Sequence, residues 1–472
     1  MTEGYRRHVG LFSATMLIAG SMIGRGVYIV AADIVRVGHS GSFLLAAWTL
    51  TAVMTLLGAL CYGELAGMFP QAGGQYAYLR EAYGPLTGFL YGWTFFAVIE
   101  CGTIAAVAVG FGKYLSAFLP WVSETRWLAG PFHLPALQAT REIAVGPYDL
   151  GLTSARLAGI LLILLLSLVN AFGVRLGARV QNLFTVAKIG SLAALIVFGL
   201  VLTPSAPADP APYSSGPGAS TLPFLVLLLV VQTGSLFSAD AWNSVTFIAG
   251  EVKEPRRTIP LSLLIGTSLV CGLYLLANWA YLRVLGPAAI ATAPLDRVGS
   301  LALKALFGPP GELLMAGAIL WSMVGCQNGL VLSGARVYQA MAADRLFLPP
   351  AAGLNRHGVP GFALGIQALW ASALTLSGSY GQLLDYVIFA ALLFYVLTVA
   401  AVIVLRRRSP HLERPVRTPL HPLLPLLYLA CALAVMGALL LHRPAFTWPG
   451  LVIVVMGLPV YFLTRKRGSW TA

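Results

Sequence analysis

The chain has 472 residues, of which 58% are hydrophobic and only 10% are charged. This composition excludes a soluble globular protein, a disordered chain and a collagen-like chain, because it leaves too few polar groups to face water. The five cysteines form no C-x-x-C pair, which excludes a disulfide scaffold and a thiol redox motif. The net charge of +13 predicts no nucleic acid partner, because the basic residues flank apolar segments and so set membrane orientation.

Apolar segments long enough to cross a lipid bilayer recur along almost the whole chain. A hydrocarbon core of about 30 Å requires about 20 helical residues at about 1.5 Å per residue. The sequence therefore predicts an all-α polytopic membrane protein. We expect twelve transmembrane helices, at 9–36, 41–68, 85–118, 153–173, 177–203, 220–249, 259–284, 311–342, 360–377, 382–405, 420–441 and 447–464.

Basic residues are concentrated on one side of these predicted spans. When the N-terminus is placed in the cytoplasm, most of the 30 Lys and Arg residues fall in cytoplasmic segments, including 406–408 and 465–467. Cytoplasmic loops of membrane proteins carry this excess of positive charge. We therefore expect a multi-pass protein of the cell membrane, plasma or inner, with cytoplasmic N- and C-termini.

The first span is interrupted by glycines and a charge near the middle of the membrane. Residues 20–26 read Gly-Ser-Met-Ile-Gly-Arg-Gly, and glycine is the residue at which a helix most readily leaves its regular geometry. For Gly20 and Gly24 alone, a close helix–helix contact is the alternative explanation. Arg25 between two glycines favours an unwound segment, since irregular backbone at membrane depth survives where it lines a cavity or lies within protein.

A second polar interruption lies in the sixth span. Residues 237–243 read Phe-Ser-Ala-Asp-Ala-Trp-Asn and separate two apolar runs. The two interruptions are five spans apart, and because five is an odd number, two five-span units would cross the membrane in opposite directions. Interrupted helices at matching places of two such halves indicate a transporter site. We expect a first repeat at 1–203 (spans one to five), an external loop at 204–219, a second repeat at 220–405 (spans six to ten), and spans eleven and twelve with the cytoplasmic C-terminus at 406–472.

Two such breaks offer the groups that recognise an α-amino acid by its main chain. Unwinding exposes N–H groups near residues 24–26, where the dipole of the outer half-helix favours an anion. Carbonyl groups are freed near Met22 in the first break and near Phe237 and Asp240 in the second. Donors for a carboxylate and acceptors for an ammonium group would then lie a few ångströms apart.

Two further charged residues, Lys188 and Glu100, stand inside predicted spans, where ionisable groups are functional by default. For Lys188 in the fifth span, the alternative is snorkelling to the interface. For Glu100 in the third span, the alternative is a structural ion pair. We expect Arg25 to pair with Glu100, which would narrow the pocket and favour small neutral substrates, and Asp240 is the competing partner of Arg25.

Several motifs resemble those of one transporter family. They are Gly20–Val27, Tyr62–Ala66, Pro70–Tyr76, Thr246–Pro260, Asn328–Gly329, Ser333–Arg336 and Ala342–Asp344. In order and spacing they resemble the amino acid–polyamine–organocation transporters, and among these the bacterial relatives of the L-type amino acid transporter light chains. The resemblance covers nearly the whole chain. It implies a five-plus-five inverted repeat with broken helices one and six, two additional C-terminal helices, alternating access, and exchange or facilitated passage of amino acids.

The resemblance also implies roles for individual residues. The substrate carboxylate would bind N–H groups of the first break and the amine would bind carbonyls of both breaks. Phe237 would close the site from outside, unless it is a packing aromatic, and Asn243 would lie beside the substrate or shape the break. The implied substrate-binding residues are Met22, Gly24, Arg25, Gly26, Phe237, Asp240 and Asn243.

Lys188 resembles a tethered substitute for the sodium ion of sodium-coupled relatives with the same fold. Its ammonium group would bond carbonyls near Ala19 or Gly20 and atoms near Cys326 or Asn328. The hydroxyl that some relatives supply from the eighth span is missing from the aligned positions, and Ala241 stands where glycine is common. We assign Lys188 and Glu100 as coupling residues.

The sequence thus predicts a secondary transporter of neutral L-amino acids that works by sodium-independent exchange, with no cofactor and no metal. Proton-coupled uptake, transport of acidic amino acids on Arg25, and a channel or receptor are the alternatives. An enzyme is excluded, because the seven histidines form no metal-binding or catalytic motif. We read 120–152 as a loop with one short interfacial helix. This segment has no cysteine, so we expect no disulfide-linked ancillary subunit. We also expect the protein to be a monomer or a weak homo-oligomer.

Overall fold

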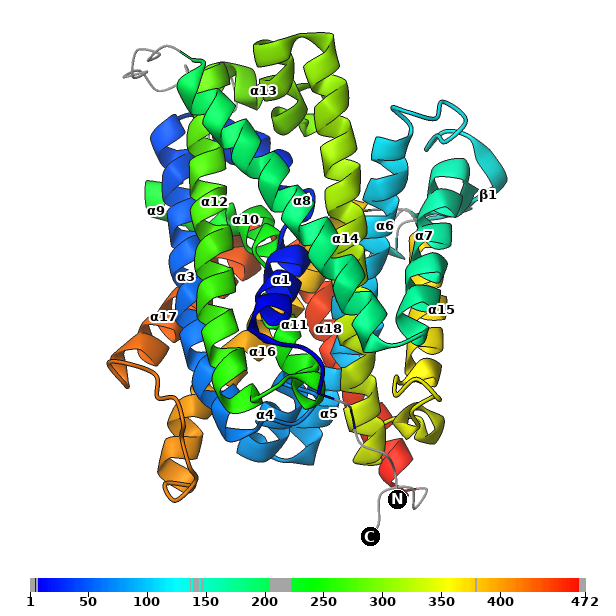
Figure 1. Cartoon of the computed structure of the whole chain (residues 1–472), viewed down its shortest axis with the longest axis vertical. Helices are drawn as coiled ribbons and strands as arrows, with labels where there is room; N and C mark the ends of the chain where they lie inside the picture. Colours follow the sequence, from blue (N-terminus) through cyan, green and yellow to red (C-terminus); the bar gives the residue numbers. More distant parts are fainter. Residues whose placement is uncertain are drawn as a thin grey trace.

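A computed structural model of the chain describes residues 5, 7–135, 137–138, 144–145, 148–203, 222–377 and 380–466. The predicted external loop at 204–219 lies outside the described residues. Long helices run along the molecule and surround the short helix α1 (Figure 1). Among the described residues, eight helices are long and apolar enough to cross a membrane. The prediction of a polytopic helical membrane protein is therefore confirmed.

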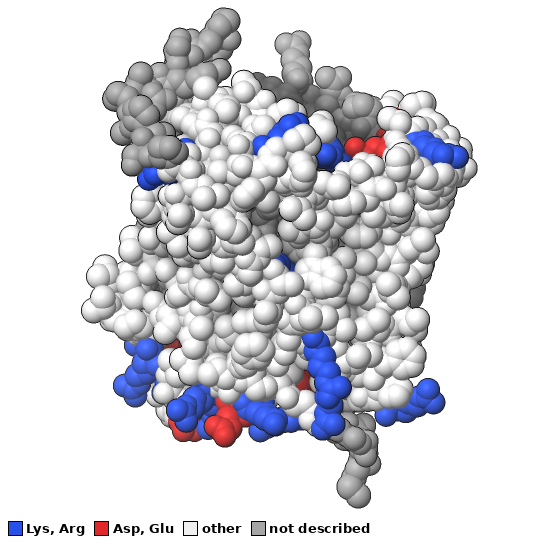
Figure 2. Space-filling view, turned by 45° about the horizontal axis from the view of Figure 1, so that its top comes forward, with Lys and Arg blue, Asp and Glu red and all other residues white. Residues whose placement is uncertain are grey.

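Charged side chains gather at the two ends of the molecule and leave a largely uncharged belt between them (Figure 2). Large apolar side chains are exposed on the long helices, and Leu165, Leu183 and Leu369 are 57%, 62% and 72% exposed. Such exposure is costly in water but not against lipid tails, which are as apolar as leucine. The belt is the surface that the bilayer covers.

The first part of the chain forms the first interrupted span and the two spans that follow it. The hydroxyl of Ser40 caps the second span by accepting a bond from the N–H of Phe43 at 3.2 Å. The third span contains a π-helical segment that its sequence pattern did not predict. The elements are α1 (Leu11–Met22), the 3-10 turn η1 (Gly26–Tyr28), α2 (Val30–Gly38), α3 (Gly41–Met68), α4 (Gln75–Tyr83), α5 (Pro85–Thr94), the π segment η2 (Phe95–Ile99) and α6 (Glu100–Leu115).

The remainder of the chain is also helical and contains the second interruption, between α10 and α11. The elements are α7 (Ser154–Ala171), α8 (Val174–Val201), α9 (Phe224–Val230), α10 (Gln232–Ser238), α11 (Ser244–Phe247), η3 (Ala249–Glu251), α12 (Pro255–Ala291), η4 (Pro294–Asp296), α13 (Val298–Phe307), α14 (Pro309–Ala343), η5 (Pro349–Ala352), α15 (Gly361–Ser377), α16 (Tyr380–Arg408), α17 (Leu423–His442) and α18 (Pro444–Lys466).

The described part of the segment 120–152 forms strands, so the prediction of an interfacial helix there is wrong and the all-α class needs this correction. Strand β1 (Trp127–Leu134) pairs antiparallel with β4 (Tyr148–Thr153), and β2 (Leu137–Gln138) pairs with β3 (Ala144–Val145). Gly130 and Gly151 have φ angles of 91° and 153°, and the pairing register between β1 and β4 shifts close to these residues. Aromatic and aliphatic residues in this segment favour a pleated surface, and pairing satisfies its backbone groups.

The end of the molecule at which the described chain begins and α18 ends (Figure 1) is closed by a buried ion pair. Arg336 of α14 donates through Nε and Nη2 to Oε1 of Glu251, at 3.2 and 3.0 Å, and the two side chains are 0% and 2% exposed. The N–H groups of His8 and Val9 donate to the carbonyl of Glu251 at 2.8 and 3.0 Å. These contacts tie the segment before α1 to η3 and α14. We call this end the terminal end.

We expect the two members of this pair to depend on each other. Arg336→Met or Glu251→Leu alone strands the other charge inside the protein, at a cost of about 3–5 kcal/mol. The double variant removes both charges and should be close to the wild type in the melting temperature of the purified protein in detergent. The control is Arg256→Met at the exposed pair with Glu413, with an expected cost of about 0–1 kcal/mol. Additive losses in the double variant would contradict this interdependence.

Candidate functional site

The first span unwinds after Met22 and leaves backbone donors at its centre. The N–H of Gly24 turns back and donates to the carbonyl of Met22 at 2.8 Å. Among the described residues, the N–H groups of Gly26 and Val27 donate to no backbone acceptor. They open the turn that leads into α2, so they lie at the positive end of the outer half-helix. This part of the break offers two donors to an anion.

The second break lies directly against the first. Between α10 and α11, Ala241 has a φ of 64°, a left-handed conformation that glycine adopts without strain. Ser238 faces Gly26 so closely that a Cβ on Gly26 would overlap its Oγ and would lie 2.6 Å from its Cβ. Glycine is required at position 26 for this contact between the two breaks.

Tyr274 of α12 joins the two breaks. Its hydroxyl lies 2.9 Å from the carbonyl oxygen of Met22 and 3.0 Å from that of Ser238, so its single hydrogen is shared between them. The carbonyl of Met22, predicted to accept from a substrate amine, therefore already faces the Gly24 N–H and the Tyr274 hydroxyl. Sequence reasoning missed Tyr274, because a tyrosine in an apolar span carries no signal of its partners.

Lys188 of α8 is fully buried and donates to three carbonyls. Its Nζ bonds the oxygens of Gly20, Ile23 and Ser322 at 2.7, 2.8 and 3.0 Å. An ammonium group has three hydrogens, and each finds an acceptor. The predicted contact with Gly20 is present, and the alternative of snorkelling to the interface is wrong. On the eighth span the partner is the carbonyl of Ser322 in α14, where we expected Cys326 or Asn328.

The aligned positions of the eighth span, Cys326 and Leu330, carry no hydroxyl, but Ser322 supplies one to the first break from a neighbouring position. The hydroxyl of Ser322 lies 2.9 Å from the carbonyl oxygen of Ile23 and 3.2 Å from that of Gly24. Ser322 lies one helical turn before Cys326, on the same face of α14. The thiol of Cys326 donates to the carbonyl of Ser21 at 3.0 Å. Two neighbouring positions of α14 thus satisfy carbonyls that the break of α1 frees.

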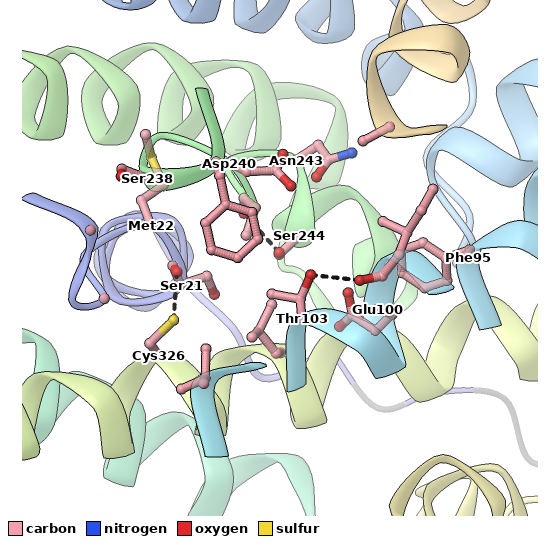
Figure 3. Close-up of a pocket in the computed structure, with 18 of the residues that line it drawn as sticks. Ser21, Met22, Phe95, Glu100, Thr103, Ser238, Asp240, Asn243, Ser244 and Cys326 are labelled. Atoms are coloured by element: carbon pink, nitrogen blue, oxygen red, sulfur yellow. Dashed lines mark hydrogen bonds between the residues drawn. The ribbon is translucent and has the colours of Figure 1, made fainter. Parts of the chain in front are cut away.

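A small cavity of about 50 Å³ lies between the two breaks and the third span (Figure 3). The structure brings the predicted residues together around it, whereas Lys188 lies behind the first break. The predicted residues in its lining are Met22, Gly24, Arg25, Gly26, Glu100, Phe237, Asp240 and Asn243.

A larger cavity of about 670 Å³ adjoins the first one and reaches the surface opposite the terminal end, which we call the vestibule end. Arg25, Gly26, Phe237 and Ser238 line both cavities. Asp33 lines the outer one with a side chain that is 70% exposed. Half-buried Phe237 therefore stands between the inner cavity and the vestibule, while the terminal end is closed.

Polar side chains of the second break are held by neighbouring helices. Asp240 accepts through Oδ1 from the hydroxyl of Tyr395 at 2.5 Å, and Asn243 donates through Nδ2 to Oε1 of Gln75 at 2.9 Å. Nε2 of Gln75 has no partner among the described residues and lies in the cavity lining. Gln75 is a site residue that sequence reasoning missed, although it stands in the motif Pro70–Tyr76.

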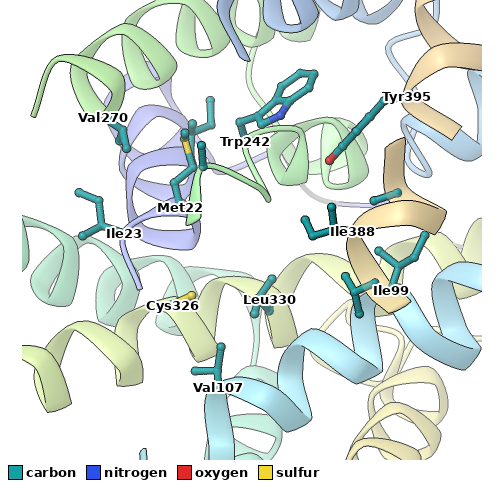
Figure 4. Close-up of a cluster of buried hydrophobic side chains, with 14 of the residues drawn as sticks. Met22, Ile23, Ile99, Val107, Trp242, Val270, Cys326, Leu330, Ile388 and Tyr395 are labelled. Carbon is teal, nitrogen blue, oxygen red and sulfur yellow. The ribbon is translucent and has the colours of Figure 1, made fainter. Parts of the chain in front are cut away.

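A cluster of buried apolar side chains packs around the breaks (Figure 4). Ile23, Val270 and Leu330 are at most 1% exposed. Trp242 is outside the cavity lining and stacks on Tyr395, with ring centroids 5.4 Å apart. In such surroundings, leaving a carbonyl or N–H group without a hydrogen bond costs far more free energy than at the surface. The hydrogen bonds of Lys188 and Tyr274 therefore stabilise the breaks strongly.

The predicted ion pair between Arg25 and Glu100 is wrong. Nη1 of Arg25 lies 3.0 Å from the Cβ position of Gly110, and Gly110 is about 15 Å farther along α6 than Glu100 at about 1.5 Å per residue. Glu100 instead points toward α14, where its Oε1 lies 2.8 Å from the Cβ position of Gly334. Gly110 has no side chain that would block Arg25, so the long side chain of Arg25 extends along α6 toward the vestibule.

The family profile described as Amino acid permease matches residues 9–461. The chain belongs to this family. It is 30% identical over 471 residues to the serine/threonine exchanger SteT of Bacillus subtilis (strain 168), with 98% of each chain covered. It is 29% identical to the b(0,+)-type amino acid transporter 1 of Homo sapiens, covering 98% of this chain and 88% of the relative.

A further relative is the large neutral amino acids transporter small subunit 2 of Mus musculus, which is 30% identical over 97% of this chain and 81% of its own. The resemblance to the amino acid–polyamine–organocation transporters is therefore confirmed.

The close contact at Gly26 yields a test of the paired breaks. Gly26→Ala forces Ser238 aside and should reduce transport by about fivefold or more, since overpacking costs about 1–3 kcal/mol. Adding Ser238→Gly removes the overlapping Cβ and Oγ and should restore part of the activity, measured as amino acid uptake into proteoliposomes. The control is Gly190→Ala on α8, where nothing lies within 4 Å of an added Cβ. If Ser238→Gly gives no rescue, the contact does not limit transport.

Proposed function

We propose that the protein is a secondary transporter that moves neutral L-amino acids across the cell membrane by sodium-independent exchange. The observation that carries the proposal is the Lys188 ammonium group bonded to carbonyls of the first break and of α14. The fixed ammonium group of Lys188 stabilises the first break as a bound sodium ion would, because it links the break to the eighth span. Since this group is part of the protein, no ion has to be transported with the substrate.

The substrate would bind between the two breaks. Its carboxylate would accept from the N–H groups of Gly26 and Val27, where the dipole of the outer half-helix favours an anion. Its ammonium group would face the carbonyl of Phe237, which accepts from the Asp240 N–H at 3.2 Å and has a second lone pair, and the carboxylate of Asp240. Asn243 and Gln75 would complete the polar lining, and Met22 and Gly24 would shape the break.

Small neutral side chains are favoured by the size of the inner cavity and by its mixed lining. The cavity is about 50 Å³ and is bordered by apolar Ile99, Val107 and Leu330 as well as by the polar groups named above. A relative named as a serine/threonine exchanger supports the same substrate class. Strong exchange of glutamate or aspartate would instead favour an acidic side chain bound by Arg25.

Alternating access would follow from the asymmetry between the two ends. In this structure the vestibule reaches the substrate cavity, with Phe237 at the boundary, whereas the Arg336–Glu251 pair closes the terminal end. Movement of Phe237 over the cavity and separation of that pair would open the opposite end. The coupling of these two events is what distinguishes a transporter from a channel.

The finer architecture is part of the proposal. We infer twelve spans, with inverted repeats at 1–203 and 220–405, an external loop at 204–219 and two additional spans within 406–472. Both termini would be cytoplasmic, because the terminal end would carry the larger share of the basic residues. We expect the protein to work as a monomer or weak homo-oligomer without a disulfide-linked subunit, since none of the five cysteines lies in 120–152.

Lys188 makes the sodium requirement testable. A fixed ammonium group and a sodium ion would repel each other at this buried position. Counterflow of a neutral amino acid into proteoliposomes should therefore proceed equally in sodium, potassium and choline buffers. Lys188→Met leaves the carbonyls of Gly20, Ile23 and Ser322 without their donor, and should lower the rate by at least about a hundredfold, since each lost bond costs about 1–3 kcal/mol.

The matched control is Lys304→Met on α13, an exposed lysine that pairs with Glu312 near the vestibule end and should change transport little. A steep dependence on sodium in the wild type, together with a mild effect of Lys188→Met, would overturn the proposal of sodium-independent exchange.

A further inference from the structure

Glu100 is buried beside the substrate cavity, and its environment is short of hydrogen-bond donors. Its side chain enters from the start of α6, and the residue is 4% exposed. Oε1 has no hydrogen-bond partner among the described residues. A buried carboxylate oxygen without a donor is expensive, so this atom needs an explanation.

Gln367 of α15 has the matching deficit. It is fully buried, and its Oε1 is also without a partner among the described residues. Both oxygens converge over Gly334 of α14, where a Cβ would lie 2.5 Å from Oε1 of Gln367 and 2.8 Å from Oε1 of Glu100. The missing side chain of Gly334 leaves room for both groups at this place.

The orientation of the Gln367 amide is fixed by a second contact. Its Nε2 donates to the carbonyl oxygen of Val331 at 3.2 Å. Turning the amide over would offer Nε2 to Glu100, but it would place Oε1 against that carbonyl, where neither oxygen has a hydrogen. The oxygen of the amide is therefore the atom on the side of Gly334 and Glu100, and neither this oxygen nor Oε1 of Glu100 has a donor among the described residues.

We infer that Glu100 holds a proton and donates it to Oε1 of Gln367, which makes this pair a proton-binding site at the edge of the substrate cavity. One added hydrogen satisfies both oxygens at once. Because the inference concerns the transport cycle, it rests on the proposed function, and it adds to that function a dependence of exchange on pH.

The groups around Glu100 support a neutral carboxyl. Asp240 of the second break lines the same cavity as Glu100, and a negative charge on it opposes a second one there. α15 contributes the uncharged Gln367, and Asp240 itself accepts from Tyr395 of α16. The other titratable neighbours carry a thiol or a phenol: Tyr91 on α5, Cys101 on α6, and Cys326 and Tyr338 on α14.

The π segment before α6 lets the stretches of the third span on both sides of it face the cavity. In a regular helix the face that carries Thr103 and Val107 would continue through positions 96 and 92, but Tyr91 and Phe95 line the cavity instead. The extra residue of the π turn Phe95–Ile99 shifts the face by one position. Both stretches of the third span therefore face the substrate, and Glu100 stands at the junction between them.

The direct test is infrared spectroscopy of the purified full-length protein, which needs no transport activity. A protonated carboxyl has a C=O stretching band that a carboxylate lacks. We expect such a band near neutral pH in the wild type and its loss in Glu100→Gln. Gln367→Leu should shift this band to the position of a carboxyl without an acceptor, whereas Glu312→Gln, at an exposed carboxylate, should leave it in place.

The second test compares exchange of a neutral amino acid between about pH 6 and about pH 9, a range in which buried glutamates titrate. The wild-type rate should fall about tenfold per pH unit once the proton is lost, and the rate of Glu100→Gln should not depend on pH. Glu100→Ala, which cannot donate to Gln367, should be impaired at both ends of the range.

Two results would overturn the inference. One is identical carboxyl bands in the wild type and Glu100→Gln. The other is a Glu100→Gln variant that selectively loses transport of amino acids with cationic side chains, which would make Glu100 an ionised ligand of those substrates. If no variant transports amino acids but the band disappears in Glu100→Gln, the proton site stands and the proposed function fails.

Discussion

The geometry of the site depends on the hydrogen bonds that the ammonium group of Lys188 makes to backbone carbonyls. Breaking a helix inside a bilayer frees carbonyl and N–H groups that have no water to bond, at a cost of several kcal/mol for each group. Lys188 satisfies the carbonyls of Gly20 and Ile23 and links them to Ser322. Without a donor at this place, the first break would be driven back toward a continuous helix.

The remaining freed groups are divided between structure and substrate. The carbonyls of Ser21 and Met22 are occupied by Cys326 and Tyr274, and those of Ile23 and Gly24 face the Ser322 hydroxyl. Among the described residues, the N–H groups of Gly26 and Val27 donate to no backbone acceptor, and we propose that they bind the ligand together with the carbonyl of Phe237. A pocket preorganised in this way would recognise the common part of amino acids and leave selection to the side-chain end of the cavity.

The sequence predicted what composition and local chemistry determine. The apolar segments, the breaks at Gly20–Gly26 and Phe237–Asn243 and the burial of Lys188 all follow from the cost of polar groups in lipid. It did not predict contacts that depend on helix packing. The direction of Arg25, the partner of Glu100 and the hydroxyl of Ser322 depend on which faces of α6, α14 and α15 meet, and the strands at 127–134 and 148–153 depend on pairing across the chain.

A density map of the protein with a bound neutral amino acid such as serine would test the proposed site most directly. We expect the substrate carboxylate at the N–H groups of Gly26 and Val27, its ammonium group near the carbonyl of Phe237 and the carboxylate of Asp240, and Lys188 still bonded to Gly20, Ile23 and Ser322. Substrate density away from the two breaks, or a Lys188 side chain that leaves these carbonyls when the substrate binds, would contradict this expectation.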